Sequence, residues 1–188
     1  MISVFSCSWS NPTIPSNFSA LYTRHKVSQI LFDLTSHFQL NSLIIGLEDR
    51  TTSLGFHNCD FSECMKNALH TNKFVSIPAH SFLALIPVET FRPSLLDNIE
   101  KINKKVQSSS PKTIDLVARQ TSLPVLIGSL LKVLEIKAGI SAKVQGSVSV
   151  YLKSADALEV LAWLFMLHSL EIRNSHGVFV VAPDYFTP

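Results

Sequence analysis

The sequence is poor in charge and in glycine, and both shortages exclude classes of function. Only 16% of its 188 residues are charged, the net charge is +2, and the basic residues are spread along the chain. A surface that binds nucleic acid needs concentrated basic charge, so no nucleic-acid partner is expected. Six glycines leave little for a phosphate-binding loop, and the G-x-S-x-G, H-E-x-x-H and dinucleotide-binding patterns are missing. We therefore expect no enzyme, no catalytic residue and no cofactor.

The sequence also lacks a long hydrophobic run. The longest, Ala157 to Leu167, is interrupted by Glu159 and is far shorter than the ~20 residues that cross a bilayer. No membrane insertion is predicted. The N-terminus is apolar at its start but has no basic region and no clear cleavage site, which argues against a secretory signal. Either export is signalled by residues outside this sequence or the mature form begins here. Residues 1–16, with two prolines, are expected to form a flexible leader.

Cysteine is scarce and its count is odd. Cys7, Cys59 and Cys64 show no paired spacing, so the sequence predicts no disulfide framework. His57, Cys59 and Cys64 form the one cluster that could suggest a nucleophile or a metal site, but their spacing fits no zinc pattern. We interpret Cys64 as a buried structural thiol and predict no metal site.

The remaining histidines are isolated. His80 and His176 fall in turns and His168 falls at a helix end. The two turn histidines, His80 and His176, are expected to be hydrogen-bonded or solvated and not catalytic. The cluster of His57, Cys59 and Cys64 keeps open one alternative, a small enzyme or metal protein.

The abundant feature is periodic apolar sequence, at 46% of residues. Alternation predicts strands and spacing near 3.6 predicts helices. In the second half the pattern predicts strand Ile114–Arg119, a helix over about Leu123–Leu134, a strand around Val148–Leu152, a polar turn over Lys153–Asp156, a helix over Ala157–His168 and two final strands. We expect a compact α+β module with its helices on one sheet face.

The first half shows the same order of elements. The pattern predicts a strand from Phe18, a helix through Phe38, a short strand Ser42–Ile45, a strand around Leu54–Phe56, a helix Phe61–His70 and a hairpin of Lys73–Ile77 with Ser81–Ile86. Pro87 and Pro183 both end a final apolar strand, and 183 − 87 = 96. A gapless shift of 96 places Leu54 on Val150 and Asp60 on Asp156. The sequence thus predicts two copies of one fold.

This repeat sets the expected organisation: a leader (1–16), a first domain (17–88), a linker helix and loop (89–112) and a second domain (113–184). Each domain is expected to be a small βαββαβ-type unit with two helices on mixed sheets. The linker helix follows from the spacing of Leu95, Ile99, Ile102 and Val106.

The second half resembles the short N-terminal domain of bacterial secretins, which is also the signalling domain of some TonB-dependent receptors. The resemblance covers Ile114 to Pro183 and is carried by the strand IDLVAR, the helix LPVLIGSLLKVL, the stretch Val144-Gln-Gly before an alternating strand, the helix ALEVLAWLFMLHSLEI and the ending GVFVVAP. The first half is similar in pattern, with Arg50 where Gly146 stands. No barrel region and no KH-like repeat follows in this sequence.

The helix over Ala157–His168 is apolar nearly all round, although a helix on one small sheet needs only about a third of its circumference apolar. Part of its surface is therefore expected to pack elsewhere, either on the linker helix or the other copy, or on a neighbouring subunit. As residues of a protein interface we predict Trp163, Met166, Val148 and Val150.

The resemblance implies a non-enzymatic assembly and docking module of a secretin-type outer-membrane channel, in a type II-like secretion or a pilus system. Its implied partners are other secretin subunits in a ring and an inner-membrane secretion platform protein. The implied location is the periplasmic side of the outer membrane. Two alternatives stay open: a TonB-dependent receptor signalling domain that binds a transmembrane regulator, and a separate subunit of a mitochondrial bacterial-type system in the intermembrane space.

Overall fold

A computed structural model describes residues 17–45, 50–91, 111–175 and 178–184. The first half contains β1 (Phe18–Lys26), α1 (Val27–His37), β2 (Ser42–Ile45), β3 (Thr51–Cys59), α2 (Phe61–Asn72), β4 (Phe74–Pro78), β5 (Leu83–Pro87) and the 3-10 turn η1 (Val88–Thr90). The second half contains β6 (Thr113–Ser122), α4 (Leu123–Val133), β7 (Gly139–Ile140), β8 (Ser147–Asp156), α5 (Ala157–Leu167), β9 (Leu170–Ser175) and β10 (Val178–Pro183). We call β1 to β5 with their helices the first repeat, and β6 to β10 with theirs the second repeat. The predicted α+β class is confirmed, with the order βαββαββ in each repeat.

The same strand pairings occur in both repeats. The first and third strands pair antiparallel (β1 with β3, β6 with β8), the second and last pair parallel (β2 with β5, β7 with β10), and the last two pair antiparallel (β4 with β5, β9 with β10). The registers agree as well. Phe18 pairs with Cys59 and Ile114 with Ala155, and 114 − 18 and 155 − 59 both give the offset of 96. The repeat is therefore present in the strand pairing and not only in the sequence pattern.

Backbone conformation gives an independent sign of the repeat. Positive φ is uncommon for residues other than glycine. Within the described ranges, eight non-glycine residues adopt it, and all fall into pairs 96 apart: Arg24 with Gln120, Gln39 with Glu135, Asn58 with Ser154, and Lys73 with Ser169. Arg24 and Gln120 sit where the strand register shifts, and each N–H donates to a serine Oγ of the partner strand, Ser53 at 3.1 Å and Ser149 at 3.0 Å. The same bulge, with the same side-chain acceptor, bends both sheets.

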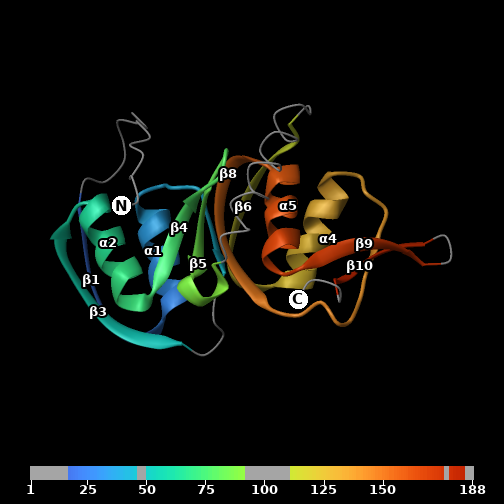
Figure 1. Ribbon diagram of the computed structural model, residues 1–188. Coiled ribbons are helices and arrows are strands. Elements are labelled where there is room, and N and C mark those ends of the chain that lie inside the picture. Colours follow the sequence, from blue (N-terminus) through green and yellow to red (C-terminus); the bar gives the residue numbers. More distant parts are fainter. Residues whose placement is uncertain (1–16, 46–49, 92–110, 176–177, 185–188) are drawn as a thin grey trace.

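One sheet belongs to both repeats. Antiparallel pairing of β2 with β8 joins the strands of the two halves in the order β4-β5-β2-β8-β6. Figure 1 shows this sheet in the middle of the molecule, with α1 and α2 on one side and α4 and α5 on the other. The pair β1-β3 closes the first repeat and β7-β10-β9 closes the second. Each pair of helices thus lies between two sheets, which corrects the expectation of helices on one sheet face only.

Because helices cover both faces of the shared sheet, its strands β2 and β8 are buried without alternation. Every residue of β2 is buried, as are Val148 to Leu152 of β8. Leu43 belongs to the core cluster of the second repeat, whereas its neighbour Ile44 belongs to that of the first. The shared sheet therefore contributes to two cores at once.

The apolar spacing of the sequence also predicts which residues form the core of each repeat, and those residues are in these two clusters. In the first repeat Leu34, Phe38 and Met65 are buried, with Leu54 and Leu69 partly buried against them. In the second, Leu130, Val150 and Leu161 are buried, with Leu134 and Phe165 partly buried. The predicted helix phases are correct.

One predicted turn needs correction, one strand was missed, and two predicted segments lie outside the described residues. Lys153 to Asp156, predicted as a turn, continue strand β8, because Ser154 takes the bulge conformation (φ 51°) and its N–H is held by Asp115 Oδ1 at 2.7 Å. Strand β7 has only two residues and gave no periodic signal. The predicted leader and linker helix lie outside the described residues.

Candidate functional site: the junction between the repeats

The junction between the repeats brings together polar and apolar residues from distant parts of the chain. Its backbone part is the ladder of β2 against β8, with Leu43 opposite Val150 and Ile45 opposite Val148. Two edge strands that would each expose unpaired N–H and C=O groups satisfy each other in this way.

Asn41 extends this ladder by one side chain. Its Oδ1 accepts from the Lys153 N–H at 2.7 Å, and its Nδ2 donates to the Lys153 carbonyl at 2.8 Å. Nδ2 also donates to the carbonyl of Ser81 at 2.9 Å, in the turn between β4 and β5. One amide thus pairs with β8 as a backbone peptide does and ties the β4–β5 turn to it.

A buried carboxylate holds the same turn from the other side. Glu159, in the first turn of α5, is fully buried. Its oxygens accept from the N–H of His80 at 2.6 Å, the N–H of Ser81 at 3.0 Å and the Ser81 hydroxyl at 2.5 Å. A buried carboxylate is costly unless such donors satisfy it. Glu159 therefore fixes α5 of the second repeat to the β4–β5 turn of the first.

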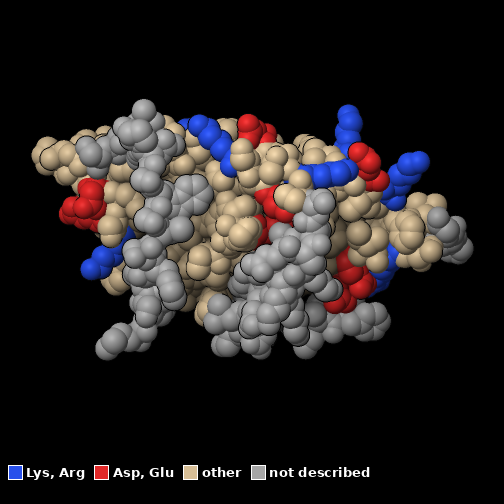
Figure 2. Space-filling model, turned by 90° about the horizontal axis from the view of Figure 1, so that it is seen from above, with Lys and Arg blue, Asp and Glu red and all other residues tan. Residues whose placement is uncertain are grey.

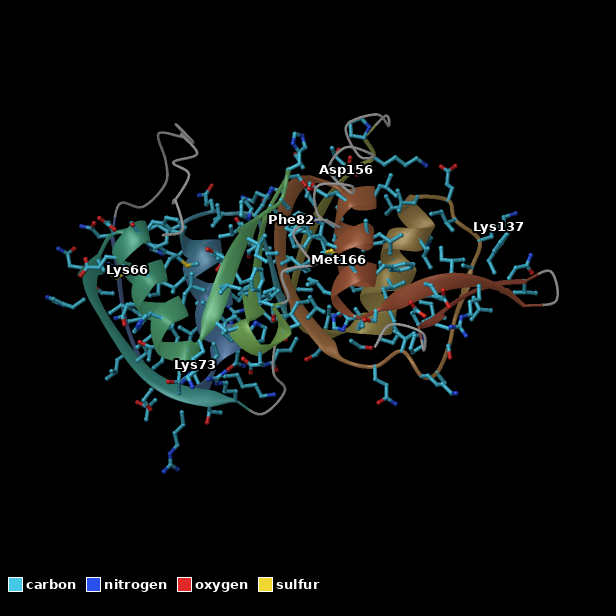
Figure 3. The ribbon with its side chains drawn as sticks, viewed as in Figure 1. Lys66, Lys73, Phe82, Lys137, Asp156 and Met166 are labelled. Atoms are coloured by element: carbon cyan, nitrogen blue, oxygen red, sulfur yellow. A yellow bond between two sulfur atoms is a disulfide. The ribbon has the colours of Figure 1, made fainter. Side chains whose placement is uncertain are left out.

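The apolar part of the junction surrounds Trp163. This residue is fully buried, and its ring meets Phe82 edge to face with centroids 5.6 Å apart. Figure 3 shows Phe82, Met166 and Asp156 where the two repeats meet. Asp156 caps α5, accepting from the N–H groups of Leu158 and Glu159. The apolar surface of α5 is explained, because the helix packs on α4, β8 and β9 of its own repeat and, through Trp163, on Phe82 of the first repeat.

On the opposite face of the shared sheet, α1 covers the second repeat. Phe32 meets the ring of Tyr151 at 6.4 Å, and the guanidinium of Arg119 lies 4.6 Å from the centroid of Phe32. Arg119 also forms an ion pair with Asp33 at 2.6 Å. Asp33 accepts from the Tyr22 hydroxyl at 3.2 Å. Burial, and after it the neighbouring Asp33 carboxylate, raises the pKa of Tyr22, so this hydroxyl stays protonated as a donor.

The four predicted interface residues lie in this junction. Trp163, Val148 and Val150 are buried inside the chain, and Met166 is partly buried against the same cluster. These residues pack against the first repeat, which was one of the two partners expected for the apolar surface of α5. Trp163, Val148 and Val150 do not offer a surface to a second protein in this conformation, because β2, β5 and Phe82 already occupy it.

The cysteine cluster needs a correction. Cys59 and Cys64 form a disulfide, which the odd cysteine count did not predict. Cys64 is fully buried, as predicted, but its sulfur is bonded to Cys59 and is not the free thiol that the sequence suggested, while His57 is exposed. No group of three or more potential metal ligands was found among the described residues. His80 contributes its backbone N–H to Glu159, and His176 lies outside the described ranges. His168 is largely buried, and this burial lowers its pKa.

We did not predict a role for Asn41, Ser81 or Glu159 from the sequence. The signal for Glu159 was present as one carboxylate in an otherwise apolar helix, on a face now known to be covered. Asn41 could not be recognised from the sequence, because asparagine is common in the turns that precede strands.

Charge does not mark a further site on the visible surface. Figure 2 shows Lys and Arg side chains interspersed with Asp and Glu and with uncharged residues over the face seen from above. None of the described helices is long and apolar enough to cross a membrane.

Comparisons with models of known protein families, with curated proteins and with solved structures found no match for this chain.

Proposed function

We propose that this chain is a non-enzymatic assembly and docking module of a secretin-type channel, in a type II-like secretion or pilus system. It contacts neighbouring subunits and an inner-membrane component of the machine. The observation that carries the proposal is the junction. Two copies of one small α+β fold join through a sheet edge and a helix face, so this fold makes protein contacts with the surfaces that an assembly module needs. The resemblance of Ile114 to Pro183 supplies the family.

The disulfide supports the proposed compartment. Disulfides persist in oxidising environments such as the periplasm and are rare in the cytosol. Cys59–Cys64 therefore fits the periplasmic side of an outer membrane. It fits equally the alternative of a separate subunit in a mitochondrial intermembrane space.

The same bond weakens the enzyme and metal alternative. That alternative used the sulfurs of Cys59 and Cys64 as nucleophile or ligands, but each is bonded to the other. A thiolate is the form that attacks or binds a metal, and neither sulfur can supply one in the oxidised chain.

Site-specific photo-crosslinking in the native cell tests the proposal. A photoreactive phenylalanine analogue replaces Phe179, or in a second strain Leu21, because both side chains are exposed. We expect adducts with a secretin-type channel or an inner-membrane secretion protein, identified by mass spectrometry. Thr71, exposed on the polar face of α2, is the control position for random collisions. Adducts with a transmembrane regulator of transcription alone would favour the receptor-signalling alternative, and adducts with neither would contradict both.

A further inference from the structure

Each of the two surfaces that meet in the junction has a counterpart in the other repeat. These counterparts lie open at the two ends of the molecule. The contact joins unlike surfaces, the β2 side of the first repeat and the β8 side of the second. The second repeat has its own counterpart of β2, which is β7, and the first has its own counterpart of β8, which is β3. Among the described residues, β7 pairs only with β10, and β3 only with β1. Contacts between unlike surfaces can continue from one molecule to the next.

We propose that a second copy of this chain docks head to tail, with the β7 edge of one molecule antiparallel to the β3 edge of the next. The register follows from the junction, in which Leu43 faces Val150 and Ile44 faces Ser149. With the offset of 96, Gly139 faces Leu54 and Ile140 faces Ser53 of the neighbouring molecule. The inference rests on the proposed function for its biological setting, since it names the neighbouring subunit and the surface that subunit uses.

Charge complementarity supports this register. In the junction, residues 41 and 159 both contact Ser81, through the Asn41 amide at 2.9 Å and the Glu159 carboxylate at 2.5 Å. The counterpart of Asn41 is Lys137 and that of Glu159 is Glu63, since 137 − 41 and 159 − 63 both equal 96. Both are exposed in the chain. Docking in the proposed register therefore brings a lysine of one molecule beside a glutamate of the next.

The side chains over the two open ends can also fit together. Where the junction packs Phe32 against Tyr151, the open ends carry Gly128 and Gly55. The space is not left empty, because Leu21 is 81% exposed and its Cδ1 lies 3.6 Å from the Cβ position of Gly55. In the docked pair, Leu21 stands at the place of the Tyr151 ring and faces Ile140, whose Cδ1 lies 3.6 Å from the Cβ position of Gly128.

The contact is weaker than the junction that it repeats. Strand β7 has two residues against four in β2. The face of α2 that corresponds to Trp163 of α5 carries Asn67, which is exposed. Weak contacts suffice where many subunits are held together in one assembly. Figure 3 shows Lys137 near one end of the molecule and Lys66, on α2, near the other, as head-to-tail docking requires.

Sedimentation velocity of the purified full chain over a concentration series tests the inference. We expect reversible association that passes beyond the dimer as the concentration rises. Lys137→Glu and Glu63→Lys should each abolish it, because each places like charges at the contact. An equimolar mixture of the two variants should restore it, because every contact then again joins opposite charges. Circular dichroism checks that both variants are folded.

Lys132→Glu is the matched control for charge. Lys132 is exposed on α4, and its counterpart Ser36 makes its hydrogen bond within α1, to the carbonyl of Asp33. This variant should associate as the unchanged chain does. A chain that stays monomeric at its highest soluble concentration, or association that both charge variants leave intact, would overturn the inference. So would a mixture that stays monomeric. Crosslinks to secretion proteins in cells together with a monomeric chain would refute head-to-tail docking and leave the proposed function standing, whereas association without such crosslinks would do the reverse.

Discussion

Glu159 is the residue on which the polar half of the junction depends. It sits three residues beyond the cap Asp156 and turns away from its own repeat to accept three hydrogen bonds from His80 and Ser81. A carboxylate that accepts backbone N–H groups at a buried site makes stronger bonds than a neutral acceptor does. The first repeat has Glu63 at the counterpart position, where it is exposed. The same residue type thus has a structural role in one copy and a solvated position in the other.

Glu159→Gln should lower the free energy of unfolding by about 1–3 kcal/mol, because the amide directs an NH₂ group at donors and loses the charge. Urea denaturation at neutral pH measures the change. Glu63→Gln is the control and should change it by less than about 0.5 kcal/mol, as exposed substitutions usually do. Equal losses for the two variants would contradict the role assigned to Glu159.

His168 makes the stability of the chain depend on pH. Burial lowers the pKa of its imidazole in the folded state, so below the unfolded pKa of about 6.5 the unfolded chain binds more protons. Stability contributed by the neutral ring is complete above that pH and is lost as the pH falls. The first repeat suggests a replacement, since Asn72 lies 96 positions earlier and donates to the carbonyl of Ala68 at 2.7 Å.

We expect the unchanged chain to lose more stability between pH 7.5 and 5.5 than His168→Asn does. Urea midpoints at several pH values measure the difference, in which the contributions of the other histidines cancel. Parallel pH curves for the two proteins would show that His168 is not responsible.

At the scale of elements, α5 and α2 show how one fold serves two environments. Helix α5 packs on α4, β8 and β9 of its own repeat, shares a core cluster with residues of β2 and β5 of the other repeat, and is apolar nearly all round. Helix α2 is covered on one side and keeps a polar face. Trp163 of α5 corresponds to Asn67 of α2, since 163 − 67 = 96. The helix in the junction thus has a buried tryptophan where the helix outside it has an exposed asparagine.

Trp163→Ala should cost about 3–5 kcal/mol in the free energy of unfolding, the usual cost of truncating a large buried side chain. Asn67→Ala should cost less than about 0.5 kcal/mol. Chemical denaturation followed by circular dichroism measures both. Trp163→Phe should retain most of the stability, because the Nε1–H of Trp163 has no partner among the described residues. A loss below 1 kcal/mol for Trp163→Ala would contradict the tight packing against Phe82.

Much at this scale could be predicted from the sequence, because local periodicity reports which face of an element is buried. Helix positions, core residues such as Leu34 and Leu130, and the 96-residue repeat all follow from it. The junction could not be predicted in this way. An apolar strand such as Ser42–Ile45 indicates that both of its faces are buried, but not which elements cover them. The excess apolar surface around Trp163 indicated an additional contact without naming the partner. Lys153 and Ser154 gave a turn signal because a bulge uses the residues that a turn uses.

For the whole molecule, the shared sheet makes the two repeats one structural unit. Its five strands take three from the first repeat and two from the second, and the cores on its two faces meet through alternate residues of β2 and β8. The Cys59–Cys64 disulfide adds a local constraint in the first repeat alone, where Ala155 and Val160 stand in the second. A unit joined in this way presents the open edges of β3 and β7, the counterparts of the two strands in the junction, at opposite ends.

The continuous sheet that β2 and β8 form between the repeats is the feature on which the junction depends. It can be tested in solution by nuclear Overhauser effects between backbone protons of residues 42–45 and 148–151 in the full chain. We expect cross-strand signals in the antiparallel register, with Leu43 beside Val150, and one rotational correlation time for both repeats. Signals within each repeat but none between β2 and β8, with the repeats tumbling independently, would contradict it.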